Sequence, residues 1–183
     1  MPFTPLRTDR LMLRGYEPHD IPALLPLIGT REVATTTLRI PHPYSESDAH
    51  DFLRMAEDHL ATGRGLHLGI FLRENGALCG GVGLTINNDH RRAELGYWLG
   101  VPSWGKGYAT EAAKALVDYG FETLNLHRIF AGHFAGNSAS ANVLKKIGMR
   151  HEGIERGHIL KWGDFIDIEI YGMILSDWQA LRR

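Results

Sequence analysis

The chain has 183 residues, of which 44% are apolar and 22% charged. This is enough for one globular domain with a full core and leaves little room for a second. Lys and Arg together number 20 against 21 Asp and Glu, for a net charge of -1, so the basic excess of a dedicated nucleic-acid-binding protein is missing. We expect a single domain over residues 1–183 and no nucleic-acid partner.

The only cysteine, Cys79, excludes an internal disulfide and suits a reducing cytoplasm. It stands in an apolar run, where a buried inert thiol is expected rather than a nucleophile. No apolar run approaches membrane-spanning length, and the N-terminus lacks a signal-peptide core. The sequence therefore predicts a cytoplasmic protein without a membrane partner.

The first third of the chain alternates one strand with helices. Residues 11–14 are predicted as a strand and residues 21–28 as a short helix. Residues 30–44 carry polar and proline signals typical of a loop, with a further short helix left open. Residues 45–48 resemble a capping box, and a helix is expected from there to the stop at Gly63.

Strand signals dominate the middle of the chain, over residues 67–72, 78–86 and 93–99. Turn-like segments separate them, which predicts antiparallel hairpins. In the third strand apolar residues alternate with Glu94, Gly96 and Trp98. Because side chains alternate along a strand with a period of two, Glu94 and Trp98 are expected on the same face.

The last part predicts a helix over 109–121, a strand over 127–133, and a helix over 138–147 with Gly148 as its left-handed cap. Two closing strands are expected over 149–158 and 165–174. The fold class is therefore α+β, an α/β sandwich in which helices flank a mixed, mostly antiparallel sheet of about seven strands.

The segment PSWGKGYATEA, residues 102–112, places Gly105 and Gly107 around Lys106 directly before a predicted helix. Free N–H groups and the helix dipole make such a turn a possible pyrophosphate cradle, to which Lys106 adds charge. The alternative is a tight strand-to-helix connection in which the glycines serve only backbone geometry. The segment is neither a P-loop nor the dinucleotide fingerprint.

Together with residues 137–149, this turn resembles the GCN5-related N-acetyltransferase (GNAT) superfamily, in its RimJ/RimL-type branch. The acyl-CoA loop of that family is Arg/Gln-x-x-Gly-x-Gly/Ala; its last two positions match Gly107 and Ala109, whereas Trp104 occupies the first. The downstream family pattern matches Asn137, Ser140, Val143, Leu144, Lys146 and Gly148. Residues 8–14, 93–99 and 167–171 resemble further motifs of the branch in the same order.

The resemblance implies a sheet whose two central parallel strands splay apart, with acetyl-CoA entering the gap as co-substrate. Backbone groups at the end of the 93–99 strand would pair with the pantetheine arm, and amides of the turn would hold the pyrophosphate. The residues implied at the cofactor are Leu99, Gly100, Val101, Trp104, Gly105, Lys106, Gly107, Tyr108, Ala109, Thr110, Asn137, Ser140 and Lys146. Lys146 is equally consistent with a solvated helix face.

Acetyl transfer from a thioester to an amine needs a base, an oxyanion donor and a proton for the thiolate. Glu94 is the candidate base, since a carboxylate beside Tyr97 and Trp98 would be partly removed from water. A structural glutamate at a strand edge is the alternative. Many relatives use a helix tyrosine as the acid, but Leu144 occupies that position; Ser140 is the substitute that the branch implies, as acid or as cofactor contact.

For the acceptor pocket the candidates are Tyr44, Trp98 and Trp162, although aromatic residues at such positions are more often core. The ten histidines show no metal-ligand spacing, so no metal is expected.

The resemblance favours an acetyl-CoA-dependent N-acetyltransferase of primary amines, most of all a protein or peptide α-amine. Small amines, polyamines and aminoacyl-nucleotides stay open as acceptors, and so does a non-catalytic acyl-CoA-binding module. A homodimer is plausible from the family alone.

Overall fold

The protein is built around one twisted eight-stranded sheet, described here by a computed structural model for residues 3–182. The strand order is β1-β2-β3-β4-β5-β6-β8-β7, and neighbouring strands are antiparallel except for β5 and β6. The strands are β1 (Leu6–Arg7), β2 (Leu11–Gly15), β3 (Gly65–Leu72), β4 (Leu78–Asn87), β5 (Arg92–Leu99), β6 (Arg128–Phe134), β7 (Arg150–Lys161) and β8 (Asp164–Ile174).

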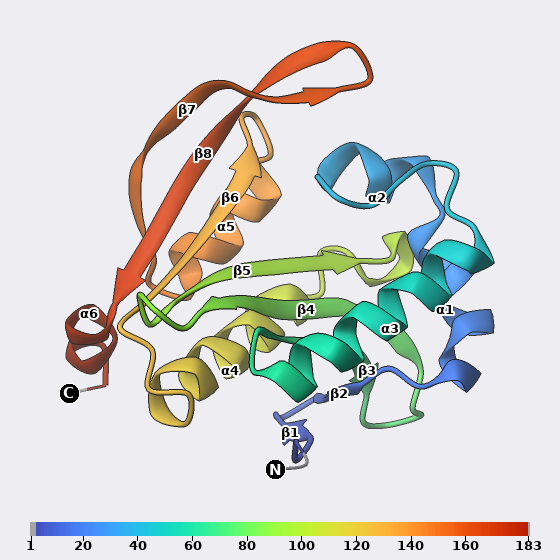
Figure 1. The fold of residues 1–183 in the computed structure, drawn as a ribbon, viewed down its shortest axis with the longest axis horizontal. Coiled ribbons are helices and arrows are strands. Elements are labelled where there is room, and N and C mark those ends of the chain that lie inside the picture. The colour runs from blue at the N-terminus through green and yellow to red at the C-terminus, as the bar shows by residue number, and fades with distance from the viewer. Residues whose placement is uncertain (1–2, 183) are drawn as a thin grey trace.

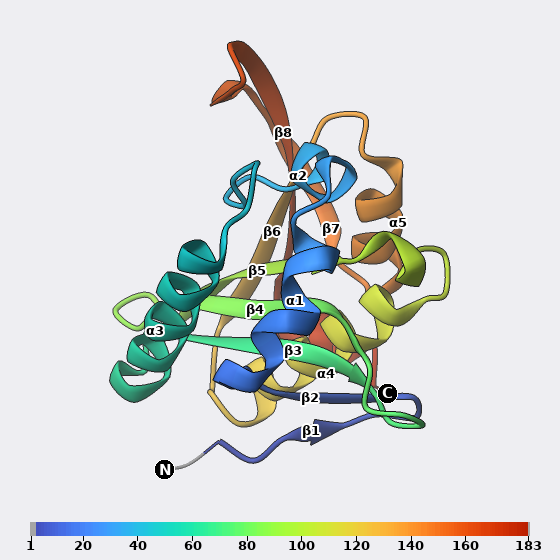
Figure 2. The same cartoon turned by 90° about the vertical axis from the view of Figure 1, so that its right-hand side faces the viewer.

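Helices cover both faces of this sheet (Figures 1 and 2). One face carries the first three, and α4 and α5 lie on the other; α6 follows β8 at the end of the chain. The helices are α1 (Ile21–Ile28), α2 (Arg31–Thr36), α3 (Glu46–Thr62), α4 (Tyr108–Glu122), α5 (Ser138–Lys146) and α6 (Leu175–Ala180), with short 3₁₀ turns η1 (Pro18–Asp20) and η2 (Val101–Ser103).

The core has two parts because alternate residues of each strand face opposite helical layers. Leu68, Leu84 and Leu95 point toward α4 and α5 and belong to the larger buried cluster. The smaller cluster, centred on Leu24 and Ala49, packs α1 against α3 on the other face. Burial of the larger set dominates the stability of the fold, at about 25 cal/mol per Å² of apolar surface removed from water.

The parallel pair β5 and β6 stays together over only three register pairs. Arg92, Ala93 and Glu94 lie opposite Arg128, Ile129 and Phe130, and beyond Glu94 the two strands separate. Figure 1 shows the two strands diverging, with β6 rising beside β8 while β5 runs toward α1. β6 instead pairs along its whole length with β8. The splayed parallel pair expected from the sequence is thereby confirmed.

The capping box expected at residues 45–48 is confirmed in detail. The Ser45 hydroxyl accepts from the Asp48 N–H at 3.2 Å, and the Asp48 carboxylate accepts from the Ser45 N–H at 2.8 Å. α3 ends at Gly63, whose φ of 66° lies in the left-handed region where glycine is favoured.

Three details of the sequence-based prediction need correction. The sheet has eight strands rather than seven, because the two-residue β1 is too short to give a hydropathy pattern. β7 runs three residues beyond the expected end at residue 158, because its hairpin partner β8 begins only at Asp164. Helix α6 was not predicted; its six residues carry no apolar periodicity, and none of them is buried.

Candidate active site

The connection from β5 to α4 exposes the first backbone N–H groups of a helix. Gly105 and Gly107 have φ angles of 73° and 80°, which side chains with a Cβ rarely adopt. Gly107 is the N-cap of α4 and offers no side chain to the first turn. The amides at the start of α4 are therefore left available to an anion, and the helix dipole favours negative charge there.

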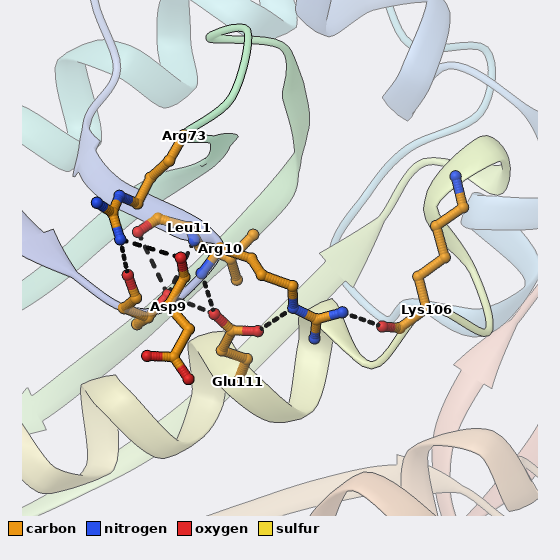
Figure 3. Close-up of polar contacts among 7 residues, drawn as sticks. Asp9, Arg10, Leu11, Arg73, Lys106 and Glu111 are labelled. Carbon is orange, nitrogen blue, oxygen red and sulfur yellow. Dashed lines mark hydrogen bonds and ion pairs between the residues drawn. The ribbon is translucent and has the colours of Figure 1, made fainter.

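This turn is fixed in place by the N-terminal strand segment (Figure 3). Arg10 donates to the Lys106 carbonyl at 2.9 Å and to the Glu111 carboxylate at 2.7 Å. Glu111 also accepts from the Arg10 N–H at 2.8 Å and from the Thr8 hydroxyl at 2.6 Å. The spacing Thr8-x-Arg10 thus has a physical role: both residues bond Glu111, and Arg10 also holds the glycine turn, about a hundred residues further along the chain.

Glu111 is kept ionised by these contacts. Burial alone would raise the pKa of its carboxyl group, but the hydrogen bonds from Thr8 and Arg10 outweigh burial and lower the pKa. Arg73 extends the network by donating to the carbonyls of Thr8 at 2.6 Å and Asp9 at 3.0 Å.

Trp104 stands where the family loop has Arg or Gln, and it caps the end of β5. Its indole Nε1 donates to the Leu99 carbonyl at 2.7 Å. That carbonyl, one of the groups expected at the pantetheine arm, is already bonded within the chain. Gly100 donates its N–H to the Cys79 carbonyl on β4 at 2.9 Å. Because hydrogen-bonded pairs alternate along an antiparallel ladder, residues 95 and 97 turn their backbone groups away from β4, toward the gap.

The start of α5 brings Asn137, Ser140 and Tyr97 together. The Asn137 side chain caps the helix by accepting from the Ser140 N–H at 3.1 Å. The Tyr97 hydroxyl lies 2.7 Å from the Ser140 hydroxyl and 3.2 Å from the Ser140 carbonyl. Tyr97 comes from β5 beyond its last pairing with β6, so this contact crosses the gap.

Tyr97 is the site residue that sequence reasoning missed. The alternation of β5 assigned it to the buried face, and the family pattern explained it as a motif position. Its hydroxyl, unlike the side chain of Leu95 on the same face, needs a polar partner when buried, and that requirement was the available signal. Leu144, at the position of the absent helix tyrosine, is fully buried in the core.

A cavity of about 970 Å³ lies on the opposite face of the sheet, beneath α1, α3 and the loop after α2. Its floor is made partly by glycines, because Gly81, Gly83 and Gly96 stand on the cavity-facing side of β4 and β5. Tyr44 and Trp98 line it, and Ser140 and Tyr97 line it from the gap between β5 and β6. Aromatic and apolar lining of this size fits an organic acceptor.

Glu94 projects into this cavity and is paired with Arg39. The Arg39 guanidinium donates to the Glu94 carboxylate at 2.8 Å, and the Glu94 side chain is 37% exposed. Glu94 is the last residue of β5 that pairs with β6, so it stands at the closed end of the gap. The expectation that Glu94 and Trp98 share a face is confirmed, since both line the cavity.

Two histidines face each other in the same cavity. His59 Nδ1 lies 2.9 Å from His67 Nε2. Burial, with the neighbouring charges of His59 and Arg39, lowers the pKa of His67 to about 4, so its ring is neutral at physiological pH. Within residues 3–182 no group of three or more His, Cys, Asp or Glu side chains is arranged to hold a metal ion.

Trp162 does not line the cavity. It lies at the tip of the β7–β8 hairpin, is 55% exposed, and has Arg31 5.7 Å and Lys161 4.9 Å from its ring centre. Lys161 donates to the carbonyls of Ala34 and Thr37 near the end of α2. Trp162, a predicted substrate residue, therefore lies beside the contact that joins the hairpin tip to α2.

Lys146 is exposed in the last turn of α5. Six residues separate it from Ser140, about 9 Å along the helix axis. Its geometry is that of a solvated helix end, and the proposed contact with the cofactor stays a prediction. In the part of the chain that the structure describes, no helix has the length and apolar character needed to cross a membrane.

Comparison with known protein families assigns the chain to a family. The family model described as "Acetyltransferase (GNAT) domain" matches residues 10–150, which contain the glycine turn, Glu94, Tyr97 and Ser140. The chain belongs to the GNAT acetyltransferase family. It is an acetyl-CoA-dependent N-acetyltransferase of the RimJ/RimL-type branch, as the sequence motifs indicate.

Several GNAT relatives match over nearly their full length. The N-acetyltransferase p20 of Bacillus licheniformis is 33% identical over 94% of this chain and 97% of its own. YdaF of Bacillus subtilis, named as a candidate ribosomal N-acetyltransferase, is 29% identical over 97% of this chain and 98% of its own. A GNAT acetyltransferase structure from Bacillus anthracis has a TM-score of 0.84 and 25% identity, covering 94% of this chain and 99% of the other.

Two further GNAT matches differ in the molecules that their names report. RimL, a ribosomal L7/L12 α-N-protein acetyltransferase solved with coenzyme A, shares the fold at a TM-score of 0.84 and 20% identity, covering 93% of this chain and 97% of the other. The spermidine N(1)-acetyltransferase of Escherichia coli (strain K12) is 40% identical over 70 residues, 38% of each chain.

Proposed function

We propose that the enzyme transfers the acetyl group of acetyl-CoA directly to a primary amine that enters the 970 Å³ cavity, and that this amine is the N-terminal α-amine of a protein or peptide. The observation that carries the proposal is the three-residue pairing of β5 and β6. It opens a gap that has the glycine turn on one face of the sheet and the cavity on the other, with Glu94 and Ser140 both at the cavity wall.

The cofactor would lie on the α4–α5 side of this gap. Amides from Lys106 to Thr110 would bind the pyrophosphate, because they begin α4 without a side-chain cap. The open backbone groups of residues 95 and 97 on β5 would pair with the pantetheine arm, and one N–H would face the thioester oxygen. This donor would stabilise the oxyanion as it develops. Acetyl-CoA supplies the activated acetyl group; the chain supplies orientation and proton transfer.

Glu94 would remove the proton from the incoming amine, directly or through one water. The neutral amine then attacks the thioester carbon and forms a tetrahedral intermediate, and the nitrogen, positively charged after the attack, releases a second proton to solvent. When the carbon–sulfur bond breaks, its electron pair stays on sulfur, and the Ser140 hydroxyl would donate the proton that the thiolate needs. Ser140 suits this role because it lines the cavity while its backbone is fixed by the Asn137 cap.

An α-amine acceptor is favoured over a polycation by the charges around the cavity. Of its four acidic lining residues, Glu94 is paired with Arg39 and Asp51 with Arg54, Asp48 is used in the capping box, and Glu155 lies 3.1 Å from His158. These carboxylates already have partners, so the wall offers little unpaired negative charge for several ammonium groups. The relationship to YdaF supports the same acceptor class.

A polyamine or other small amine is the second candidate, and the match to the spermidine enzyme favours it. That match covers 38% of the chain. Under this alternative the paired carboxylates would exchange Arg39 and Arg54 for ammonium groups of the substrate.

The test is release of free thiol from acetyl-CoA with four separate acceptors: peptides with free N-termini, the same peptides with blocked N-termini, spermidine, and free amino acids. We expect saturable release with free-N-terminal peptides and none with the blocked ones. Preferential release with spermidine would replace the α-amine by a polyamine. Tight acetyl-CoA binding without release in any arm would support the non-catalytic binding module.

A further inference from the structure

The contact between Tyr97 and Ser140 is the least expected polar feature of the gap. Their hydroxyl oxygens are 2.7 Å apart, a normal hydrogen-bond length for two hydroxyl groups. Tyr97 belongs to β5 and Ser140 to the first turn of α5. The contact therefore spans the gap between β5 and β6, which the cofactor arm is proposed to occupy.

Two hydrogen arrangements satisfy the same heavy-atom positions. In the first, Tyr97 donates to the Ser140 carbonyl at 3.2 Å and accepts the Ser140 hydroxyl proton. In the second, Tyr97 donates to Ser140 Oγ, and the Ser140 proton is free to point into the cavity. Hydroxyl protons rotate readily, so the serine changes from an internally bonded state to a donating state without any heavy-atom movement.

The environment of Tyr97 keeps it a donor. Burial raises the pKa of its phenol to about 12, while the hydrogen bond to Ser140 acts in the opposite direction. The phenol is therefore protonated throughout the physiological range. Its ring packs against the larger core cluster, which limits the positions that the hydroxyl can reach.

The side chain of a serine early in a helix can also form a different hydrogen bond. Its hydroxyl commonly turns back to a carbonyl three or four residues earlier. The Tyr97 hydroxyl opposes that arrangement because its hydrogen bond with Oγ favours the side-chain rotamer that holds the oxygen at the mouth of the gap. Among residues 3–182, the Tyr97 hydroxyl is the hydrogen-bond partner of the Ser140 hydroxyl, so without it only the backbone of α5 positions that side chain.

We propose that Tyr97 is the positioning residue for Ser140: it aims the serine hydroxyl at the departing sulfur and stabilises the serine oxygen while its proton is transferred. This inference rests on the proposed function of Ser140. In the step itself the proton leaves Ser140 Oγ for the thiolate, and the Tyr97 hydrogen bond stabilises the negative charge left on Oγ. Solvent then returns one proton to Ser140, which balances the proton that the nitrogen releases after attack, and Glu94 gives the first proton to solvent.

A double-mutant cycle tests the proposal. Tyr97→Phe removes only the hydroxyl and keeps the packing of the ring, and Ser140→Ala removes the group that it is proposed to position. Single-turnover acetyl transfer is measured so that product release does not hide the chemical step, and acetyl-CoA affinity is measured by calorimetry. Tyr119→Phe is the matched control; this ring packs edge-on against Phe3 and does not line the cavity.

Acid–base catalysis by one group contributes about 10²–10⁴-fold. We expect Ser140→Ala to lower the single-turnover rate by about 10²-fold and Tyr97→Phe to lower it by about tenfold, which is 1.4 kcal/mol, with acetyl-CoA affinity unchanged. The double variant should match Ser140→Ala alone.

The remaining outcomes overturn the proposal. If Tyr97→Phe reduces the rate by the same factor in the Ser140→Ala background, Tyr97 acts through packing. If Tyr97→Phe equals wild type, or if Tyr119→Phe shows the same loss, Tyr97 has no specific role while the transferase itself stands. If the wild type acetylates no amine of the panel, the proposed function fails, and this inference fails with it.

Discussion

The guanidinium of Arg39 lies 2.8 Å from the carboxylate of Glu94, so the loop after α2 is held to the middle of the sheet by the residue that we propose as the base. Arg39 is largely exposed, and Glu94 stands where an amine acceptor must arrive. An amine approaches as an ammonium ion at neutral pH and carries the same charge as Arg39. The two therefore compete for one carboxylate.

The variant Arg39→Ala removes that competition. We expect KM for the amine to fall by about two- to fivefold, the factor that corresponds to the usual strength of an exposed ion pair, about 0.4–1 kcal/mol. The affinity for acetyl-CoA should not change. Initial-rate kinetics of this variant beside Arg64→Ala, whose ion pair with Asp58 lies outside the cavity lining, provide the comparison. A rise in KM would mean that Arg39 binds the acceptor.

Replacement of the proposed base tests the chemistry more directly. Glu94→Gln keeps the size and much of the hydrogen bonding of the side chain but cannot accept the proton of the amine. We expect kcat to fall by about 10²–10⁴-fold, the range of general base catalysis. Calorimetric binding of acetyl-CoA should match wild type. Retention of wild-type kcat would reduce Glu94 to a structural partner of Arg39.

The glycine turn predicts a cofactor-specific effect of one methyl group. Gly107→Ala puts a Cβ at φ 80° and 3.4 Å from the Arg10 guanidinium, which costs about 1–2 kcal/mol. We expect acetyl-CoA to bind about tenfold more weakly because the first amides of α4 are displaced. Gly76→Ala, at φ 73° in the turn between β3 and β4, imposes similar strain elsewhere. It should lower the thermal midpoint without changing the affinity.

Gly96 offers a way to fill the cavity without disturbing the sheet. It lines the cavity from β5, and a Cβ built there meets no atom within 4 Å. Gly96→Ala and Gly96→Leu should therefore reduce amine turnover in a graded way, with the larger side chain having the larger effect and acetyl-CoA binding retained. Gly15→Leu, at the equally open end of β2, is the control for folding. Full turnover in Gly96→Leu would move the acceptor path elsewhere.

Glu111 predicts a pH dependence of stability. Its pKa is lowered in the folded protein, so its contribution is present above the ordinary glutamate pKa of about 4.3 and is lost as the pH falls through the folded-state value. We expect Glu111→Gln to be less stable than wild type by about 1–2 kcal/mol at pH 7, with the difference narrowing below pH ~4. Urea unfolding at several pH values measures this. Glu57→Gln, on the exposed side of α3, should show no such convergence.

Local signals in the sequence were sufficient for most of the fold. The capping box at Ser45 and the left-handed glycines at the ends of α3 and after α5 depend on only a few neighbouring residues, and the structure has them as predicted. The placement of β8 between β6 and β7 could not be predicted from such local signals. It depends on contacts between residues far apart in the chain, which hydropathy patterns do not encode.

The candidate site likewise has local features that the sequence predicts and long-range contacts that it does not. The turn at Gly107 is a local conformation, so the sequence indicated it directly. The tether from Arg10 to Glu111, the Tyr97–Ser140 contact and the Arg39–Glu94 pair each join distant segments. Trp162, a candidate for the acceptor pocket from the sequence, lies outside the cavity lining, because the length and bend of the β7–β8 hairpin decide where its tip lies.

Apart from the pairing of the two-residue β1 at the edge, the three-residue pairing of β5 and β6 is also the narrowest connection within the sheet. Within residues 3–182, backbone pairing between the two halves of the sheet is confined to this seam and the adjoining bonds to Arg91. Across the open part of the gap, the Tyr97 hydroxyl reaches both the hydroxyl and the carbonyl of Ser140. The width of the gap is therefore tied to the geometry of these two contacts.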